Sequence, residues 1–192
     1  MKRIAAAVSG FLFAACASGP APAATTAAAA SAAPPDWWRA HVEFITRDGG
    51  TWVSPIADHA DPAAPEAYAM QWQATHGGYV LVGRLYGLRH GQEVAEYWTF
   101  REFWHPGERR AIALQWGGAG AHGAGESRWE NGEGVLDQTF WLPDGRSWRE
   151  GHRNRERGDE YSTQAFDIDA QGQWAPNPTR SWRRVPAAAV AR

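Results

Sequence analysis

The sequence predicts an all-β protein: an antiparallel up-and-down barrel of eight to ten strands, with one short helix on its N-terminal side. Two observations carry this prediction. After residue 50, large apolar residues recur with the period of two that is typical of a strand. Turn signals such as Asn131-Gly132 and Pro143-Asp144-Gly145 interrupt this pattern every eight to fifteen residues. An open sheet in this order would leave two exposed edges, and closure into a barrel removes both.

A short helix is expected before the first strand. Pro34-Pro35-Asp36 supplies a stop followed by an N-cap residue. Trp37, His41 and Phe44 then fall on one face at helical spacing. Asp48-Gly49-Gly50 predicts the end of the helix, because glycine readily adopts the left-handed conformation that terminates one.

Ten strands are expected after the helix, joined by hairpins. The glycine-rich segment 117–125 is expected to form a mobile loop that covers the barrel mouth at the end opposite the helix, or else a linker between hairpins. The expected strands are residues 51–55, 67–75, 79–88, 93–104, 109–116, 125–130, 135–142, 147–155, 160–169 and 174–184.

The first residues predict export from the cytoplasm. Met1-Lys2-Arg3 is positively charged, an apolar run follows, and small residues surround Cys16. This order is typical of a secretory signal peptide, and the apolar run is too short to span a bilayer. We expect residues 1–15 to be the signal peptide.

Ala14-Ala15-Cys16 resembles a bacterial lipobox, in which the cysteine becomes the lipidated N-terminus. Lipidation at Cys16 would tether the protein to a membrane, and we expect a periplasmic lipoprotein anchored in the outer membrane. The alternative is ordinary cleavage in the alanine-rich sequence. The domains expected after the signal are an Ala/Pro/Ser/Thr-rich disordered tether over 16–35, the barrel over 36–185 and a disordered tail over 186–192.

Composition argues against several classes of function. The formal net charge is −2 and the arginines are scattered, which disfavours a nucleic-acid partner. No histidine pair has metal-ligand spacing, and no G-x-S-x-G motif is present. We expect no metal and no cofactor, with haem on a single axial histidine, His152, as the open alternative. The oligomeric state is left open.

One face of an expected strand combines bulky aromatic groups with carboxylates. In residues 93–104, Glu96, Trp98 and Glu102 share a face, and bulk favours that face as the interior. Buried glutamates need partners such as Arg128, because an unpaired buried charge is costly. The alternative is that these charges point to solvent and the tryptophans are core.

A second strand repeats this feature with a histidine. In residues 147–155, Trp148, Glu150 and His152 share a face. A mostly apolar interior with sparse polar groups suits a small-molecule cavity. The predicted ligand-binding residues are Glu96, Trp98, Glu102, Trp116, Arg128, Phe140, Trp148, Glu150 and His152.

The short helix, the following Gly50-Thr51-Trp52 and the long meander resemble the calycin superfamily, which comprises lipocalins and their bacterial relatives. The resemblance spans residues 36–185. In lipocalins a G-x-W sequence opens the first strand, and an arginine near the end of the barrel packs over that tryptophan. The resemblance therefore implies structural roles for Gly50, Trp52 and an arginine. Arg180, Arg183 and Arg184 are available, and we assign Arg183.

These observations predict an envelope-located protein that binds a small hydrophobic or amphipathic molecule inside the barrel, and they favour a binding protein over an enzyme. Two alternatives stay open. One is an isomerase or hydratase that acts on a lipid-like substrate through an acid–base pair in the cavity. The other is an envelope protein that binds a protein partner through surface aromatic residues, which predicts a filled barrel and an exposed aromatic patch.

Overall fold

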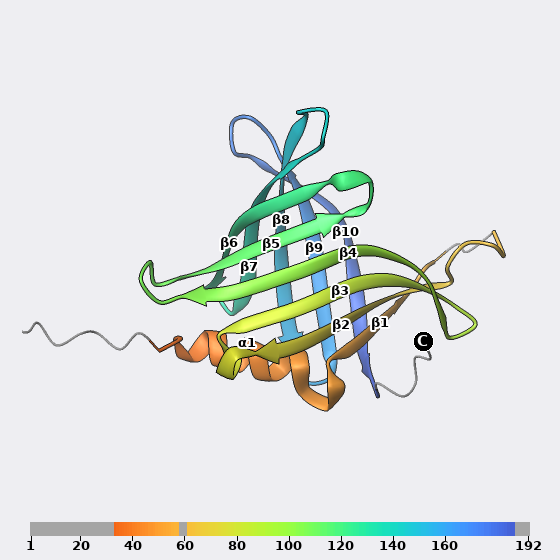
Figure 1. Ribbon diagram of the computed structural model, residues 1–192, viewed down its shortest axis with the longest axis horizontal. Coiled ribbons are helices and arrows are strands. Elements are labelled where there is room, and N and C mark those ends of the chain that lie inside the picture. Colours follow the sequence, from red (N-terminus) through yellow and green to blue (C-terminus); the bar gives the residue numbers. More distant parts are fainter. Residues whose placement is uncertain (1–32, 58–60, 187–192) are drawn as a thin grey trace, which may run out of the picture. The chain divides into compact units, whose positions relative to one another are not determined.

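The computed structural model describes residues 33–57 and 61–186. Within these residues the chain forms a closed antiparallel barrel of ten strands with one α-helix at one end, which confirms the predicted fold class (Figure 1). The elements are α1 (Asp36–Thr46), η1 (Arg47–Gly49), β1 (Thr51–Pro55), β2 (Ala67–Thr75), η2 (His76–Gly78), β3 (Val80–Arg89), β4 (Gln92–His105), β5 (Arg110–Gly117), η3 (Gly118–Gly120), β6 (His122–Glu130), β7 (Glu133–Trp141), β8 (Ser147–Arg157), β9 (Glu160–Ile168) and β10 (Trp174–Val185).

Every strand pairs with its neighbours in the sequence, and β1 closes the barrel against β10 through Thr51 opposite Val185. Hairpin turns make this order possible. Asn131 and Gly132 both have positive φ, at 53° and 82°, which is the conformation of a tight two-residue hairpin. The β7–β8 and β9–β10 turns lie at the end of the barrel opposite α1 (Figure 1).

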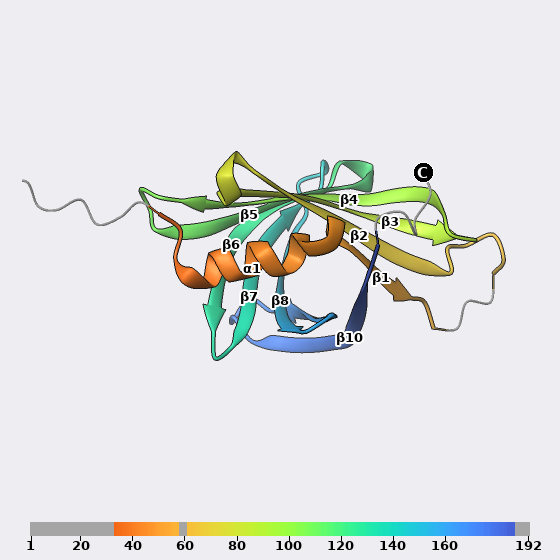
Figure 2. The ribbon, with the colours of Figure 1, turned by 90° about the horizontal axis from the view of Figure 1, so that it is seen from below.

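Helix α1 lies across one end of the barrel (Figure 2) and is held there by indole hydrogen bonds. Trp38 is fully buried, and its Nε1 donates to the Gly78 carbonyl oxygen at 2.8 Å. Trp52 is fully buried as well, and its Nε1 donates to the Ile45 carbonyl oxygen at 2.9 Å. The polar atoms of both rings are therefore satisfied inside an apolar core.

The start of α1 differs from the expectation by one residue. Pro35 occupies the N-cap position and Asp36 is the first helical residue, so Asp36 is not the N-cap. Its carboxylate lies in the first turn, where the helix dipole favours a negative charge.

The G-x-W segment is packed at the junction of α1 and the barrel. Gly50 has φ of 63°, and a Cβ there would lie 2.2 Å from the Trp72 carbonyl oxygen, so only glycine fits. Arg184 lies over the Trp52 ring, with its Cζ 4.6 Å from the ring centroid. The assignment of Arg183 is therefore corrected to Arg184: strand alternation puts Arg184 on the same face as Trp182, while Arg183 is exposed.

The glycine-rich loop is shorter than expected, because β6 already begins at His122. Gly123 pairs with Phe140 in the β6–β7 ladder, and the Phe140 ring occupies the space that a side chain at residue 123 would need. A glycine is thus compatible with the strand here because it leaves room for a cross-strand aromatic ring.

Several expectations fall outside the described residues. The signal peptide, Cys16 and the tether up to residue 32 are among them, as is the tail after residue 186. In the described part of the chain, no helix has the length and apolar character needed to cross a membrane.

Candidate ligand cavity

A cavity of about 390 Å³ lies inside the barrel. Its volume falls in the range typical of small-molecule sites. All strands except β1 and β6 contribute residues to its lining. The lining residues are Met70, Trp72, Leu85, Trp98, Phe100, Glu102, Gln115, Leu136, Phe140, Trp148, Glu150, His152, Asn154, Tyr161, Thr163, Ala165, Pro178, Arg180 and Trp182.

One wall of the cavity is largely apolar. Phe140 stacks on Trp148 with ring centroids 5.0 Å apart, and Trp98 meets the Phe140 ring edge-on at 5.5 Å. Phe100 stacks on Trp72 at 5.2 Å. These contacts hold a continuous aromatic surface in place, against which an apolar ligand could bury its surface.

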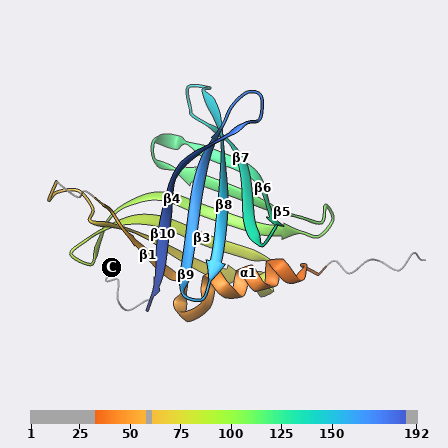
Figure 3. The same cartoon turned by 180° about the vertical axis from the view of Figure 1, so that it is seen from behind.

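The polar side chains of the cavity come mainly from β8. Its alternate residues Trp148, Glu150, His152 and Asn154 all line the cavity, because successive residues of a strand point to opposite faces. Glu156 continues this series and contacts α1 through His41. Figure 3 shows β8 running from the turns at the open end down to α1.

Glu150 and His152 form a hydrogen-bonded pair within the cavity. His152 Nε2 lies 2.9 Å from Glu150 Oε1. Burial raises the pKa of the Glu150 carboxyl, but hydrogen bonding and charge from His152 and a hydrogen bond from Trp148 outweigh burial, and the pKa ends below its ordinary value. Glu150 is therefore a carboxylate, and Nε2 of His152 is the donor.

Glu102 behaves in the opposite way. Burial raises the pKa of its carboxyl above the ordinary value, and the nearby Glu156 raises it further. His41, His152 and a hydrogen bond from Ser127 lower the pKa of Glu102 but do not offset burial. Glu102 thus keeps its proton to higher pH than an exposed glutamate does.

His41 of α1 and Glu156 of β8 form a buried hydrogen-bonded pair. His41 Nδ1 is 2.5 Å from Glu156 Oε1, and their side chains are only 12 % and 9 % exposed. Burial lowers the pKa of His41, but the hydrogen bond and charge of Glu156 outweigh it and the pKa is raised. Both members of this pair act on the pKa of Glu102.

Arg180 of β10 carries a guanidinium into the cavity. Its Cζ lies 4.7 Å from the Tyr68 ring centroid and 5.9 Å from that of Trp182. Among the residues that the structure describes, none forms an ion pair or hydrogen bond with Arg180. Its donors are therefore available to an anionic group inside the cavity.

The structure brings six of the nine predicted ligand-binding residues together on the cavity wall: Trp98, Glu102, Phe140, Trp148, Glu150 and His152. Their role in binding stays a prediction.

Glu96 is placed on the outer face, which corrects its expected position beside Trp98. A bulge in the β3–β4 ladder is the reason: Trp98 lies opposite Leu85, and Glu96 lies opposite Tyr86, so one extra residue separates them. Each bulge shifts the alternation by one residue and moves the residues beyond it to the other face. Glu96 instead lies 3.6 Å from Arg84.

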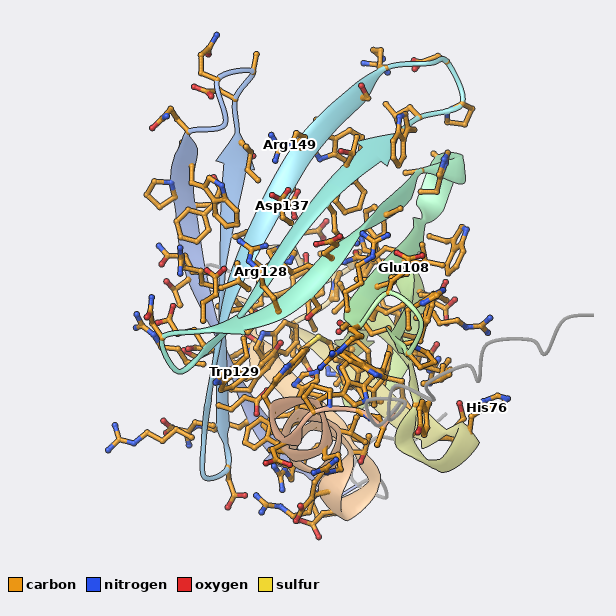
Figure 4. The ribbon with its side chains drawn as sticks, turned by 90° about the vertical axis from the view of Figure 1, so that its left-hand side faces the viewer. His76, Glu108, Arg128, Trp129, Asp137 and Arg149 are labelled. Carbon is orange, nitrogen blue, oxygen red and sulfur yellow. The ribbon has the colours of Figure 1, made fainter. Side chains whose placement is uncertain are left out.

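Trp116 and Arg128 also lie on the outer face. Trp116 follows the cavity-lining Gln115 in β5, so its side chain points to the other face of the strand, and it is 46 % exposed. Arg128 pairs with Glu130 rather than with a cavity glutamate. Figure 4 labels Arg128. It also labels Asp137 of β7 and Arg149 of β8, which form an ion pair with 3.0 Å between Oδ2 and Nη2.

Two parts of the site were missing from the sequence-based set. The sequence offers Arg180 only as a candidate structural arginine, and it does not predict the His41–Glu156 pair. Glu156 had a usable signal, since it extends the series Glu150, His152, Asn154 at a spacing of two. His41 had none, because its contact depends on how α1 lies against the barrel.

Neither models of protein families nor curated proteins match this chain. The site must therefore be interpreted from its own chemistry.

Proposed function

We propose that this protein binds a small amphipathic molecule inside its barrel. The apolar part of the ligand lies against the aromatic wall formed by Trp98, Phe140 and Trp148, and an anionic group lies at Arg180. The observation that carries this proposal is a guanidinium without an ionic partner in a cavity with an aromatic wall. A cavity is also what distinguishes a ligand-binding barrel from a filled barrel that serves only as an interaction surface.

The proposal includes the class of protein and its location. Gly50, Trp52 and Arg184 are arranged as the resemblance to calycins implies, which supports a calycin-like binding protein. The sequence of residues 1–16 supports export and a lipid anchor at Cys16, which would place the protein at the outer membrane of the bacterial envelope.

Two fluorescent probes test the proposal. 1-Anilinonaphthalene-8-sulfonate is an amphipathic anion, and N-phenyl-1-naphthylamine has the same aromatic body without the sulfonate. We expect both to bind, and Arg180→Met to weaken binding of the sulfonate about tenfold while leaving the neutral probe nearly unchanged. Arg183→Met is the matched control, because Arg183 is exposed on the outer face of the same strand.

Two results would contradict the proposal. One is that neither probe binds the folded protein. The other is that Arg180→Met and Arg183→Met weaken sulfonate binding equally, which would mean that overall charge rather than the cavity guanidinium attracts the anion.

A further inference from the structure

We propose that the cavity also catalyses proton transfer, with His152 as the general base, Glu102 as the general acid and Glu150 as the residue that positions His152. The substrate class is a small apolar compound with an acidic C–H next to a carbonyl group. This inference rests on the proposed function, because the substrate must enter the same cavity.

The three side chains reach one space from two walls. Glu102 comes from β4, whereas Glu150 and His152 come from β8, and three strands of the closed barrel separate β4 from β8. A molecule in the cavity is therefore flanked by a carboxyl group from one wall and an imidazole from another. A molecule packed against the aromatic side chains is shielded from water on that side, which strengthens both contacts.

The hydrogen bond between Glu150 and His152 sets the role of each imidazole nitrogen. A carboxylate can only accept, so His152 Nε2 carries the hydrogen that points to Glu150 Oε1 at 2.9 Å. The lone pair is then on Nδ1, and the carboxylate stabilises the imidazolium that forms when Nδ1 takes up a proton.

The surroundings of Glu102 and Glu150 shift the pKa values of their carboxyl groups in opposite directions. Burial raises the pKa of Glu102, whereas contact with His152 lowers that of Glu150 despite burial. Glu102 therefore keeps its proton to higher pH than Glu150 does, so the two carboxyl groups are suited to different roles, donor and base partner. Such a separation within one cavity is typical of an acid–base site.

The reaction balances without a further reactant. Nδ1 of His152 takes the proton from carbon, and the C–H electron pair forms a carbon–carbon double bond while the carbonyl oxygen accepts the proton of Glu102. In a substrate whose acidic C–H lies between the carbonyl and a carbon–carbon double bond, the product of this step is a dienol. The dienol takes the proton from the imidazolium at its far (γ) carbon, its O–H proton returns to Glu102, and the double bond moves into conjugation with the carbonyl. The net change is an isomerisation.

Other charged groups act on this site and will shape its pH profile. Facing Glu102 are His41 from α1, Glu156 and His152 from β8, and Tyr161 from β9. Ser127 from β6 hydrogen-bonds to it. His41 and Glu156, which pair with each other, act on the Glu102 pKa in opposite directions: His41 lowers it and Glu156 raises it.

The probe for this activity is 5-nitrobenzisoxazole, a small aromatic compound that reports on a base in an apolar cavity. A base takes the proton from its ring carbon, the C–H electron pair forms a nitrile, and the N–O bond breaks to release a coloured phenolate. We expect the wild-type protein to accelerate this reaction and His152→Gln to lose about 100-fold in rate. Glu102→Gln should lose about tenfold, because the phenolate oxygen then lacks its proton donor.

Controls separate a catalytic role from a structural one. His122→Gln changes an exposed histidine that stacks on Trp141 outside the cavity, and it should keep the wild-type rate. Glu150→Gln should lower kcat with KM unchanged, and Glu150→Asp should restore part of the rate, as expected for a positioning residue. Thermal unfolding of each variant shows whether it is folded.

The outcomes distinguish this inference from the proposed function. If the probe quenches the tryptophan fluorescence of wild type but reacts no faster than with His152→Gln, catalysis is refuted and ligand binding stands. If the probe does not bind the folded wild-type protein, the inference is refuted, and the proposed function fails with it only when neither fluorescent probe binds.

Discussion

The same alternation of inward and outward residues builds both ends of the barrel, but one end is filled with side chains and the other encloses a cavity. At the end covered by α1, Trp38, Ile45 and Trp52 are at most 1 % exposed and form a filled aromatic core. At the other end, Trp148 is 36 % exposed, and Glu150 and His152 line a cavity with it. The helix accounts for the difference, because its side chains fill one end and leave the other open. Stability is thus expected to depend on the first end and ligand chemistry on the second.

The largest expected effect contrasts one tryptophan from each end. Trp38→Ala removes a fully buried ring that also anchors α1 to Gly78, and we expect it to lower the free energy of unfolding by about 3–5 kcal/mol. Trp148→Ala should cost about 1 kcal/mol, the value of its stacking on Phe140. Chemical denaturation measures both, and equal losses would contradict the division of roles.

A smaller effect is expected from the two neighbouring arginines of β10. Arg184 is 4 % exposed, lies over Trp52 and donates from Nη2 to the Phe44 carbonyl oxygen at 3.0 Å. Arg184→Met should lower the free energy of unfolding by about 2 kcal/mol. Arg183→Met, on the exposed face, should stay within about 0.5 kcal/mol of wild type in the same denaturation experiment. A larger loss from Arg183→Met would return the structural role to Arg183.

The mildest effect concerns pH. Burial raises the folded-state pKa of Glu102, so the unfolded chain releases this proton first, and the contribution of Glu102 to stability is lost as pH rises through the folded pKa. Glu102→Gln removes that loss. Its stability relative to wild type should therefore be lowest below pH 4.5 and increase as pH rises above that value, as measured by urea denaturation at several pH values.

Glu133 supplies the control of opposite sign. A hydrogen bond from Arg155 lowers the pKa of the Glu133 carboxyl, so its stabilising contribution is present above the ordinary glutamate value and is lost as pH falls. Glu133→Gln should therefore be less stable than wild type near neutral pH, with the difference shrinking in acid. If the two variants followed the same pH trend, the opposite environments of these carboxyls would be refuted.

The order and extent of the strands could be predicted from the sequence because local signals determine them. The expected strands over 51–55 and 67–75 coincide with β1 and β2, since turn residues bound them clearly. The early start of β6 could not be predicted from its glycines, because the ring that packs beside Gly123, that of Phe140, belongs to another strand. Gly123 and Phe140 lie on different strands, so the pattern of residues within one strand cannot reveal their contact.

Within the site, alternation correctly grouped Trp148, Glu150 and His152 on one face, because β8 is regular. It failed at Glu96, where the bulge shifts the phase of β4 by one residue. It could not supply His41 either, since helix packing brings that residue to Glu156. The inward-facing residues of a regular strand can therefore be predicted from the sequence. Residues beyond a bulge, or residues that a packed helix brings to the site, cannot be predicted in this way.

The central claim is that the open end of the barrel is hollow and holds a ligand, and filling that space tests it most directly. Ala165 lines the cavity, and Ala165→Trp would place an indole inside it. Ala124 lies on the outer face, two residues from Glu126 along β6, and Ala124→Trp is the matched control. We predict that Ala165→Trp weakens binding of 1-anilinonaphthalene-8-sulfonate at least tenfold and that Ala124→Trp leaves it unchanged, with both variants folded. Equal binding by the two variants would contradict the account.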